Sequence, residues 1–84
     1  MWKTLFMPRA RKDLIKLEKT ISKRIIEKLE KALINPQKSF QQLTDSPYWK
    51  LRVGDYRIIA LADEEKKLIE IRRIGHRKNI YNKI

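Results

Sequence analysis

The sequence predicts an α+β domain in which an N-terminal strand precedes a helical hairpin and an antiparallel three-stranded meander, with the helices packed on one face of the sheet. Two patterns predict it: apolar residues recur at helical spacing from 14 to 33, and they alternate with polar residues from 49 onward. A chain of 84 residues can build one hydrophobic core, so we expect a single domain over residues 1–84.

The N-terminal half predicts one strand and two helices. Trp2–Met7 is an apolar segment closed by Pro8, which suits a short strand. We then expect helices at roughly 9–18 and 20–34, with a break at Lys19-Thr20, where the threonine can cap the second helix. An Asn-Pro pair directly after this helix ends it, because the residue before a proline avoids the helical region. The lysines on the opposite faces are typical of a solvated surface.

The C-terminal half predicts the meander. A polar loop over 37–47 leads to an alternating strand over 49–53, and Gly54-Asp55 supplies a tight turn. Tyr56–Ala62 has apolar residues on both faces, so we expect this strand to be central in the sheet. Lys67–Ile74 follows an acidic turn and completes the meander.

Two turn lengths predict the register of the meander. With a two-residue turn at Gly54-Asp55 and a four-residue turn at 63–66, Arg52 lies opposite Arg57, and Arg57 lies opposite Arg72. Like charges directly opposite cost roughly 0.2–1 kcal/mol a pair, which a fold tolerates more readily if the row holds phosphates. The alternative is that these arginines extend into solvent or pair with acids. The same register predicts a core face made of Trp49, Leu51, Val53, Tyr56, Ile58, Ala60, Ile69 and Ile71.

The charge balance points to a polyanionic partner. The chain has 21 Lys and Arg against 10 Asp and Glu, a formal net charge of +11. Nucleic acid, an anionic membrane surface or an acidic protein would match this charge, whereas a merely lysine-rich surface would carry more acids in ion pairs. The absence of cysteine excludes disulfides, thiolate metal sites and cysteine nucleophiles. No apolar run reaches the length of about 18 residues that a membrane helix needs, so we expect a cytoplasmic protein without a membrane partner.

The C-terminal tail is basic and free of acids. Its cations from residue 72 onward are Arg72, Arg73, Arg77, Lys78 and Lys83. His76 and Tyr81 are interleaved with them, a combination typical of single-stranded RNA grooves, in which charge binds the backbone and rings stack on bases. Each ring alone has a plainer explanation, because a lone histidine is often incidental and a tyrosine often anchors a chain end.

If RNA held in such a groove were also cleaved, the residues of this chain would limit the chemistry. Attack of a 2′-hydroxyl on the adjacent phosphorus needs a base, stabilisation of the phosphorane charge and an acid for the leaving oxygen. A two-histidine mechanism is excluded by the single histidine, and the sequence has no H-E-x-x-H motif or clustered carboxylates that would indicate a metal. Arginines then remain as electrostatic clamps, with Tyr81, Lys50 or His76 as proton carriers. We expect no cofactor and no metal.

Two motifs give the chain a resemblance to a known family. R-V-G-D-Y-R at 52–57 and G-H-R-K-N-I-Y at 75–81, together with the order of elements, resemble the RelE/ParE superfamily of toxins from type II toxin–antitoxin systems over nearly the whole chain. The resemblance implies a RelE-like fold. It further implies a metal-independent endoribonuclease that cuts mRNA in the ribosomal A site, inhibits translation and leaves a 2′,3′-cyclic phosphate.

The resemblance also implies roles for individual residues. Arg57 and Arg77 would stabilise the charge of the transition state. Tyr81, His76 and Lys50 would orient the substrate or transfer protons. The side chains expected to bind RNA or the ribosome are Arg52, Arg72, Arg73 and Lys78. One departure concerns Tyr48, which stands where several RelE members have a second lysine, so the general base stays unassigned.

Partners and alternatives follow from the same resemblance. The expected partners are the ribosome, mRNA and a cognate RelB-like antitoxin, and a heterotetramer with the antitoxin is one assembly that the family allows. The +11 charge independently favours an acidic chain that folds along the surface. The first alternative is a ParE-like inhibitor of DNA gyrase. The second is a catalytically inactive nucleic-acid-binding member of the same fold.

Overall fold

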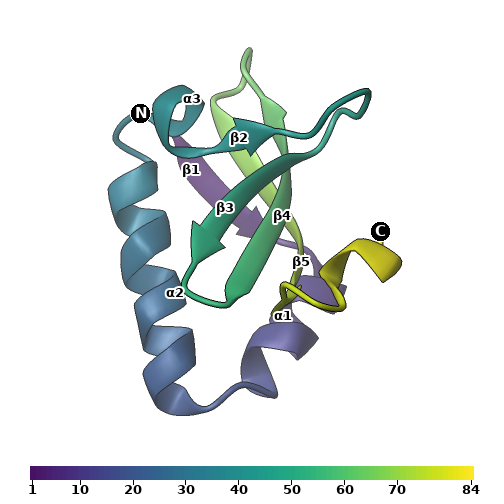
Figure 1. Ribbon diagram of the computed structural model, residues 1–84. Coiled ribbons are helices and arrows are strands. Elements are labelled where there is room, and N and C mark those ends of the chain that lie inside the picture. Colours follow the sequence, from purple (N-terminus) through teal and green to yellow (C-terminus); the bar gives the residue numbers. More distant parts are fainter.

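The computed structural model describes residues 1–84 and contains one five-stranded sheet in the order β1-β5-β4-β3-β2. The strands are β1 (Lys3–Phe6), β2 (Gln41–Gln42), β3 (Trp49–Val53), β4 (Tyr56–Asp63) and β5 (Leu68–His76). Strands β3, β4 and β5 form the antiparallel meander, while β1 runs parallel to β5 at one edge and β2 antiparallel to β3 at the other. The prediction that β4 is central is confirmed (Figure 1).

Two longer helices and one short helix complete the fold. They are α1 (Pro8–Ile15), α2 (Lys19–Ala32) and α3 (Pro36–Ser39), with a 3₁₀ turn η1 (Ile80–Asn82) near the C-terminus. The break between α1 and α2 lies at 16–18, so Thr20 is inside the second helix and the prediction that it caps that helix is wrong. The structure also corrects the 37–47 loop, which contains part of α3 and all of β2. None of the helices combines the length and the apolar character that a membrane span requires.

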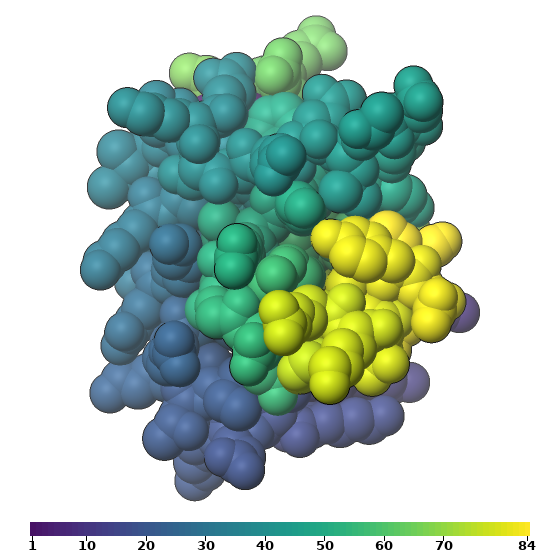
Figure 2. All heavy atoms as spheres, viewed as in Figure 1, coloured from purple at the N-terminus to yellow at the C-terminus, as the bar shows by residue number.

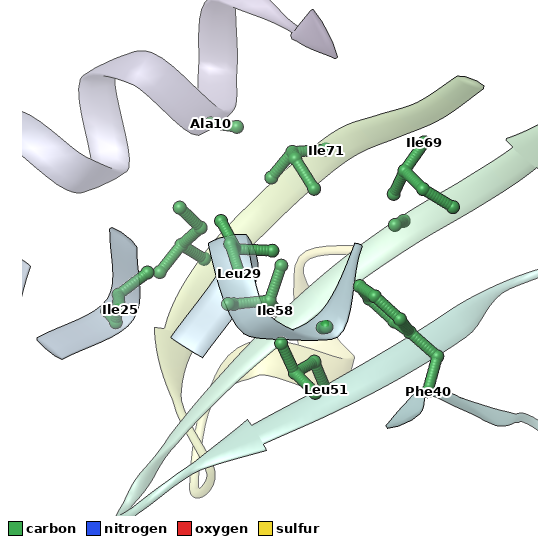
Figure 3. Packing of buried hydrophobic residues seen from close by; sticks show 11 residues of the cluster. Ala10, Ile25, Leu29, Phe40, Leu51, Ile58, Ile69 and Ile71 are labelled. Carbon is green, nitrogen blue, oxygen red and sulfur yellow. The ribbon is translucent and has the colours of Figure 1, made fainter. Parts of the chain in front are cut away.

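One core joins the helices to the sheet. Figure 3 shows Ala10 of α1 and Ile25 and Leu29 of α2 beside sheet residues, and all belong to one buried cluster. The sheet contributes Leu51, Ile58, Ala60, Ile69, Ile71 and Ile74, with Trp49, Val53 and Tyr56 partly buried against them. Both helices therefore cover the same sheet face, as predicted, although they diverge in Figure 1 from the short link between them: α1 packs on β5 and α2 against β3.

The two hairpins of the meander differ in how well their registers were predicted. The pairing of Arg52 with Arg57 in β3–β4 is confirmed. In β4–β5 the turn begins one residue later than predicted, since Asp63 pairs with Leu68, and a bulge beside Ile59 shifts the register again. Arg57 therefore lies opposite Gly75, and the predicted Arg57–Arg72 pairing is wrong.

Candidate active site

The buried guanidinium of Arg57 lies where β3 and β4 meet. Arg57 is only 9% exposed, and its Nη1 donates hydrogen bonds to the carbonyl oxygens of Gly54 and Tyr56, each at 2.9 Å. Gly54 has a φ of +57°, a left-handed conformation that glycine adopts without strain. The three ion pairs of the protein all involve other arginines, so no carboxylate lies within 4 Å of this guanidinium. The site thus has a buried positive charge held by neutral carbonyls.

Two further cations share the sheet face of Arg57. Arg52 is directly opposite it on β3, and Lys50 is two residues earlier on the same strand and therefore on the same face. Neither side chain belongs to an ion pair. Three sequence-predicted site residues are thus brought together on the face opposite the helices. Like charges opposite each other destabilise a sheet, and no acidic side chain pairs with Arg52 or Arg57 to offset this.

The C-terminal tail crosses this face at Gly75. A Cβ at Gly75 would lie 3.1 Å from Cδ1 of Ile80 and 3.6 Å from Nζ of Lys83. Ile80 is fully buried, so the tail is anchored on β5 by this side chain rather than by Tyr81, which is 46% exposed. Figure 2 shows the yellow tail packed on the same side of the molecule as the green β3–β4 hairpin.

Lys83 is a candidate site residue that the sequence analysis missed. Its amine lies over Gly75, and Gly75 is the register partner of Arg57. It therefore adds a cation to the same face. In the sequence Lys83 is only one base among several in the tail, and nothing but the fold of the tail over Gly75 singles it out.

Arg77 is tied to the turn that Arg57 holds. Its backbone N–H donates a hydrogen bond to the carbonyl of Asp55 at 2.8 Å, and its Nε lies 3.8 Å from Oδ1 of the same aspartate. Both side chains are more than half exposed, so this ion pair is weak and the guanidinium stays accessible. Lys78 is also exposed and belongs to no ion pair.

His76 does not share the face of Arg57. It lies opposite Tyr56, the two rings meeting edge to face with centroids 5.6 Å apart, and strand alternation places both on the helix side of the sheet. The N–H of Lys78 donates to Nδ1 of His76 at 3.2 Å, which leaves the proton of the neutral imidazole on Nε2. His76 therefore does not lie on the sheet face that carries Lys50, Arg52 and Arg57.

Arg72 and Arg73, both predicted to bind RNA, have acidic partners within the protein. Arg72 donates a hydrogen bond to Glu70 at 3.2 Å in a partly exposed pair. Arg73 forms two hydrogen bonds to the carboxylate of Asp13 in α1, at 2.9 and 3.2 Å, and both side chains are under 20% exposed. Their charges are therefore compensated, unlike those of Arg52 and Arg57.

Asp13 closes an open edge of the sheet. Strand β1 ends at Phe6, so β5 has no strand partner on that side beyond Ile71, and the Asp13 carboxylate accepts a hydrogen bond from the N–H of Ile74 at 2.9 Å. Burial acts to raise the pKa of Asp13, but the hydrogen bonds from Arg73 and Ile74 and the positive charges of Arg73 and Lys83 outweigh it and hold that pKa below its usual range. A single aspartate in a basic helix gives no sequence signal of this role.

Comparison with known proteins identifies the family. The family model described as the ParE toxin of the type II toxin–antitoxin system parDE matches residues 5–81. The chain belongs to the RelE/ParE superfamily of toxins. No curated protein sequence matches it. As a member of this superfamily the protein is a toxin of a type II toxin–antitoxin system.

Solved RelE structures share the fold of this toxin. The chain matches the RelBE2 toxin–antitoxin complex of Mycobacterium tuberculosis with a TM-score of 0.83 and 26% identity, covering 89% of this chain and 96% of that one. The intact RelBE complex of E. coli matches with a TM-score of 0.76 and 26% identity, over 90% and 96% of the two chains. The RelB–RelE complex of Methanococcus jannaschii matches with a TM-score of 0.71 and 27% identity, over 95% and 98%.

Proposed function

We propose that this toxin is a ribosome-dependent, metal-independent endoribonuclease that cleaves mRNA in the A site and so inhibits translation. The observation that carries the proposal is the buried guanidinium of Arg57, which has no carboxylate partner and lies beside Arg52 and Lys50. A preorganised positive charge of this kind stabilises an anion that develops during a reaction. The phosphorane formed during RNA cleavage is such an anion.

The proposed reaction is attack by the 2′-oxygen of the substrate on the adjacent phosphorus. The new bond joins O2′ to phosphorus, the bond from phosphorus to O5′ breaks, and the products are a 2′,3′-cyclic phosphate and a 5′-hydroxyl. Arg57 and Arg77 stabilise the extra charge on the phosphoryl oxygens. The proton of the 2′-hydroxyl goes to a base and O5′ receives one from an acid. The candidates are Lys50, which lies on the cationic face formed by Lys50, Arg52 and Arg57, and Tyr81, which is exposed on the tail that crosses this face.

His76 has a smaller part in this proposal than its position in the motif implies. Its ring packs against Tyr56 on the helix side of the sheet, and its Nδ1 already accepts a backbone hydrogen bond. We assign it to holding the turn at 76–78, which places the backbone of Arg77 against Asp55.

The partner that neutralises the toxin is proposed to be a RelB-like antitoxin. The matched structures from M. tuberculosis, E. coli and M. jannaschii are antitoxin–toxin complexes. The +11 charge of this chain favours an acidic partner. If the protein encoded next to this toxin binds its folded state, the melting temperature of the toxin rises with the concentration of that protein.

The decisive experiment maps mRNA cleavage on programmed ribosomes with the wild-type toxin, Arg77→Ala and a control variant, Arg9→Ala. Arg77 and Arg9 are both exposed arginines, but Arg9 lies on α1, away from the cationic face. Loss of one charge-stabilising donor costs about 10²–10³ in rate, so we expect A-site cuts from wild type and control and a loss of that size in Arg77→Ala. Equal cutting by all three proteins contradicts the site assignment.

Inhibition of DNA gyrase is the second candidate, because the matching family model is that of the ParE toxin. The same three proteins are therefore added to a supercoiling assay. Gyrase inhibition without any mRNA cleavage would replace the endoribonuclease proposal. RNA binding without either activity would indicate the inactive member of the fold.

A further inference from the structure

A second cationic groove lies between α2 and the β3–β4 turn. It has a volume of about 230 Å³ and is lined by Arg24, Glu27, Lys28, Lys31, Arg52, Val53 and Gly54. Only Arg52 belongs to the cationic face already described. The other three cations come from α2 and have no part in the candidate active site. In Figure 2 the blue α2 lies along the green hairpin, with the yellow tail on the same side of the molecule.

The three cations of α2 form a row. Arg24, Lys28 and Lys31 are spaced i, i+4, i+7 and therefore share one face of the helix. Each of them directly precedes a buried residue of α2, and these buried residues are Ile25, Leu29 and Ala32. The row therefore lies beside the surface on which α2 packs against β3. With a rise of 1.5 Å per residue, the row extends for about 10 Å along the helix. A linear array of this length suits a chain of successive negative groups better than a single ion.

The cations of the groove are uncompensated. Four of its lining residues are cationic and one, Glu27, is acidic, and none of the four cations takes part in an ion pair. Like charges at i and i+4 destabilise a helix. The opposite edge of the sheet shows that this fold can neutralise a cation, because there Asp13 meets Arg73 at 2.9 Å. Nothing comparable occurs in the groove.

We propose that this groove binds the phosphate backbone of the RNA substrate beyond the cleaved bond. Arg52 lines the groove and also faces Arg57, so it joins the two cationic surfaces into one continuous track. The substrate class rests on the proposed function, whereas the groove and its charges do not. The bound groups are the phosphodiesters of several consecutive nucleotides outside the active site.

RNA fits the groove better than an acidic helix does. Helical partners dock through apolar anchors, and Val53 is the single apolar side chain larger than alanine among the lining residues. The hollow between α1 and α2 is different, because Leu14, Ile15, Leu17 and Ile26 line it. Phosphates, in contrast, need cations and little apolar area. The composition of the groove therefore favours a nucleic-acid backbone.

The test measures the binding of a 2′-O-methyl RNA hairpin as a function of salt concentration. The blocked 2′-oxygens prevent cleavage by 2′-attack, so binding is measured separately from activity. The test variant is Arg24→Gln/Lys28→Gln/Lys31→Gln. The control is Arg9→Gln/Lys12→Gln/Lys16→Gln, which removes the same three charges from exposed positions on and next to α1. The slope of log K against log salt is negative, and each lost phosphate contact reduces its magnitude by about 0.7–0.9.

We expect the test variant to bind more weakly and the magnitude of its slope to fall by about two to three, while the control keeps the wild-type slope. Equal slopes for the test variant and wild type overturn the proposal. So does unchanged RNA binding combined with weaker binding of the test variant to the antitoxin, which would assign the groove to that partner. If the groove result holds but programmed ribosomes show no cuts, the proposed activity fails and the phosphate site stands.

A second measurement uses the wild-type protein and needs no folded variant. Acylation of lysine amines is compared with and without the RNA hairpin. RNA in the groove protects Lys28 and Lys31 and leaves Lys12 and Lys16 reactive. Equal reactivity of all four lysines in the complex contradicts the proposal.

Discussion

The two edges of the sheet treat positive charge in opposite ways. At the β5 edge, Arg73 is met by the carboxylate of Asp13, and both side chains are largely buried. At the β3 edge, Arg52 faces Arg57 and neighbours the row on α2, without an acid in an ion pair with any of them. Arginines that look alike in the sequence therefore divide into two kinds. Arg73, with its buried carboxylate partner, holds the fold together, whereas Arg52 and Arg57, which have none, keep an unpaired positive charge.

The largest expected effect is on the unpaired side of this comparison. Replacing Arg57 by Gln keeps a polar side chain with N–H donors but removes the positive charge that now lies against the carbonyl of Gly54. We expect cleavage on ribosomes to fall by about 10²–10³, the loss seen when one charge-stabilising donor is removed, while thermal unfolding stays cooperative. Wild-type cleavage by a folded Arg57→Gln protein would break the distinction between the two kinds of arginine.

The next effect is on stability at the paired edge. Asp13→Asn removes the charge from two hydrogen bonds to Arg73, and hydrogen bonds to charged groups contribute about 1.5–3 kcal/mol each. We expect unfolding by urea to show a loss of about 2–3 kcal/mol at neutral pH. Glu30→Gln serves as the control, because this exposed glutamate belongs to no ion pair. A loss no larger than that of the control would mean that the buried pair adds nothing.

The same edge predicts a pH dependence. The pKa of Asp13 is lower in the folded protein than in the unfolded chain, so the unfolded chain takes up the proton first as the pH falls. The stability contributed by its charge is complete above the ordinary aspartate pKa of about 3.9 and is lost as the pH falls through the folded value. Urea unfolding of wild type and Asp13→Asn should therefore converge toward acid pH. A difference that stays constant with pH would contradict this cause.

The smallest effect concerns the contact between the tail and β5. In Gly75→Ala the new Cβ would lie 3.1 Å from Cδ1 of Ile80, so the tail must shift by a few tenths of an ångström. Overpacking costs typically about 1–3 kcal/mol, and we expect the lower end because a tail near the chain end can move. Amide exchange at 80–82 should accelerate while that of β4 is unchanged. Unchanged exchange in η1 would show that Ile80 does not anchor the tail.

The sequence predicted the parts of the fold that depend on short-range patterns. A glycine-containing two-residue turn determined the β3–β4 register, and alternation then placed Leu51 and Ile58 in the core. The β4–β5 register failed because Ile71 and Ile74 both face the core although they are three residues apart. A bulge reconciles this spacing with a strand, and two consecutive arginines between two isoleucines were its only trace in the sequence.

The candidate site was predictable to a similar degree. Lys50, Arg52 and Arg57 share one face because strand alternation and the first turn require it. The bulge reverses the faces beyond Arg72, so His76 lies with Tyr56 and Gly75 lies opposite Arg57. Asp13 and Lys83 could not have been found from spacing, because Asp13 contacts Ile74 far along the chain and Lys83 depends on how the tail folds over Gly75.

The parallel pairing of β1 with β5 has a consequence for how the chain folds as it is synthesised. The first strand in the sequence, β1, finds its partner only after residues 68–71 have been synthesised. Because folding during synthesis proceeds from the N-terminus, α1 and α2 are made before most of the sheet that they cover. The pairing of β1 with β5 is therefore a long-range contact that forms late in the folding of this chain.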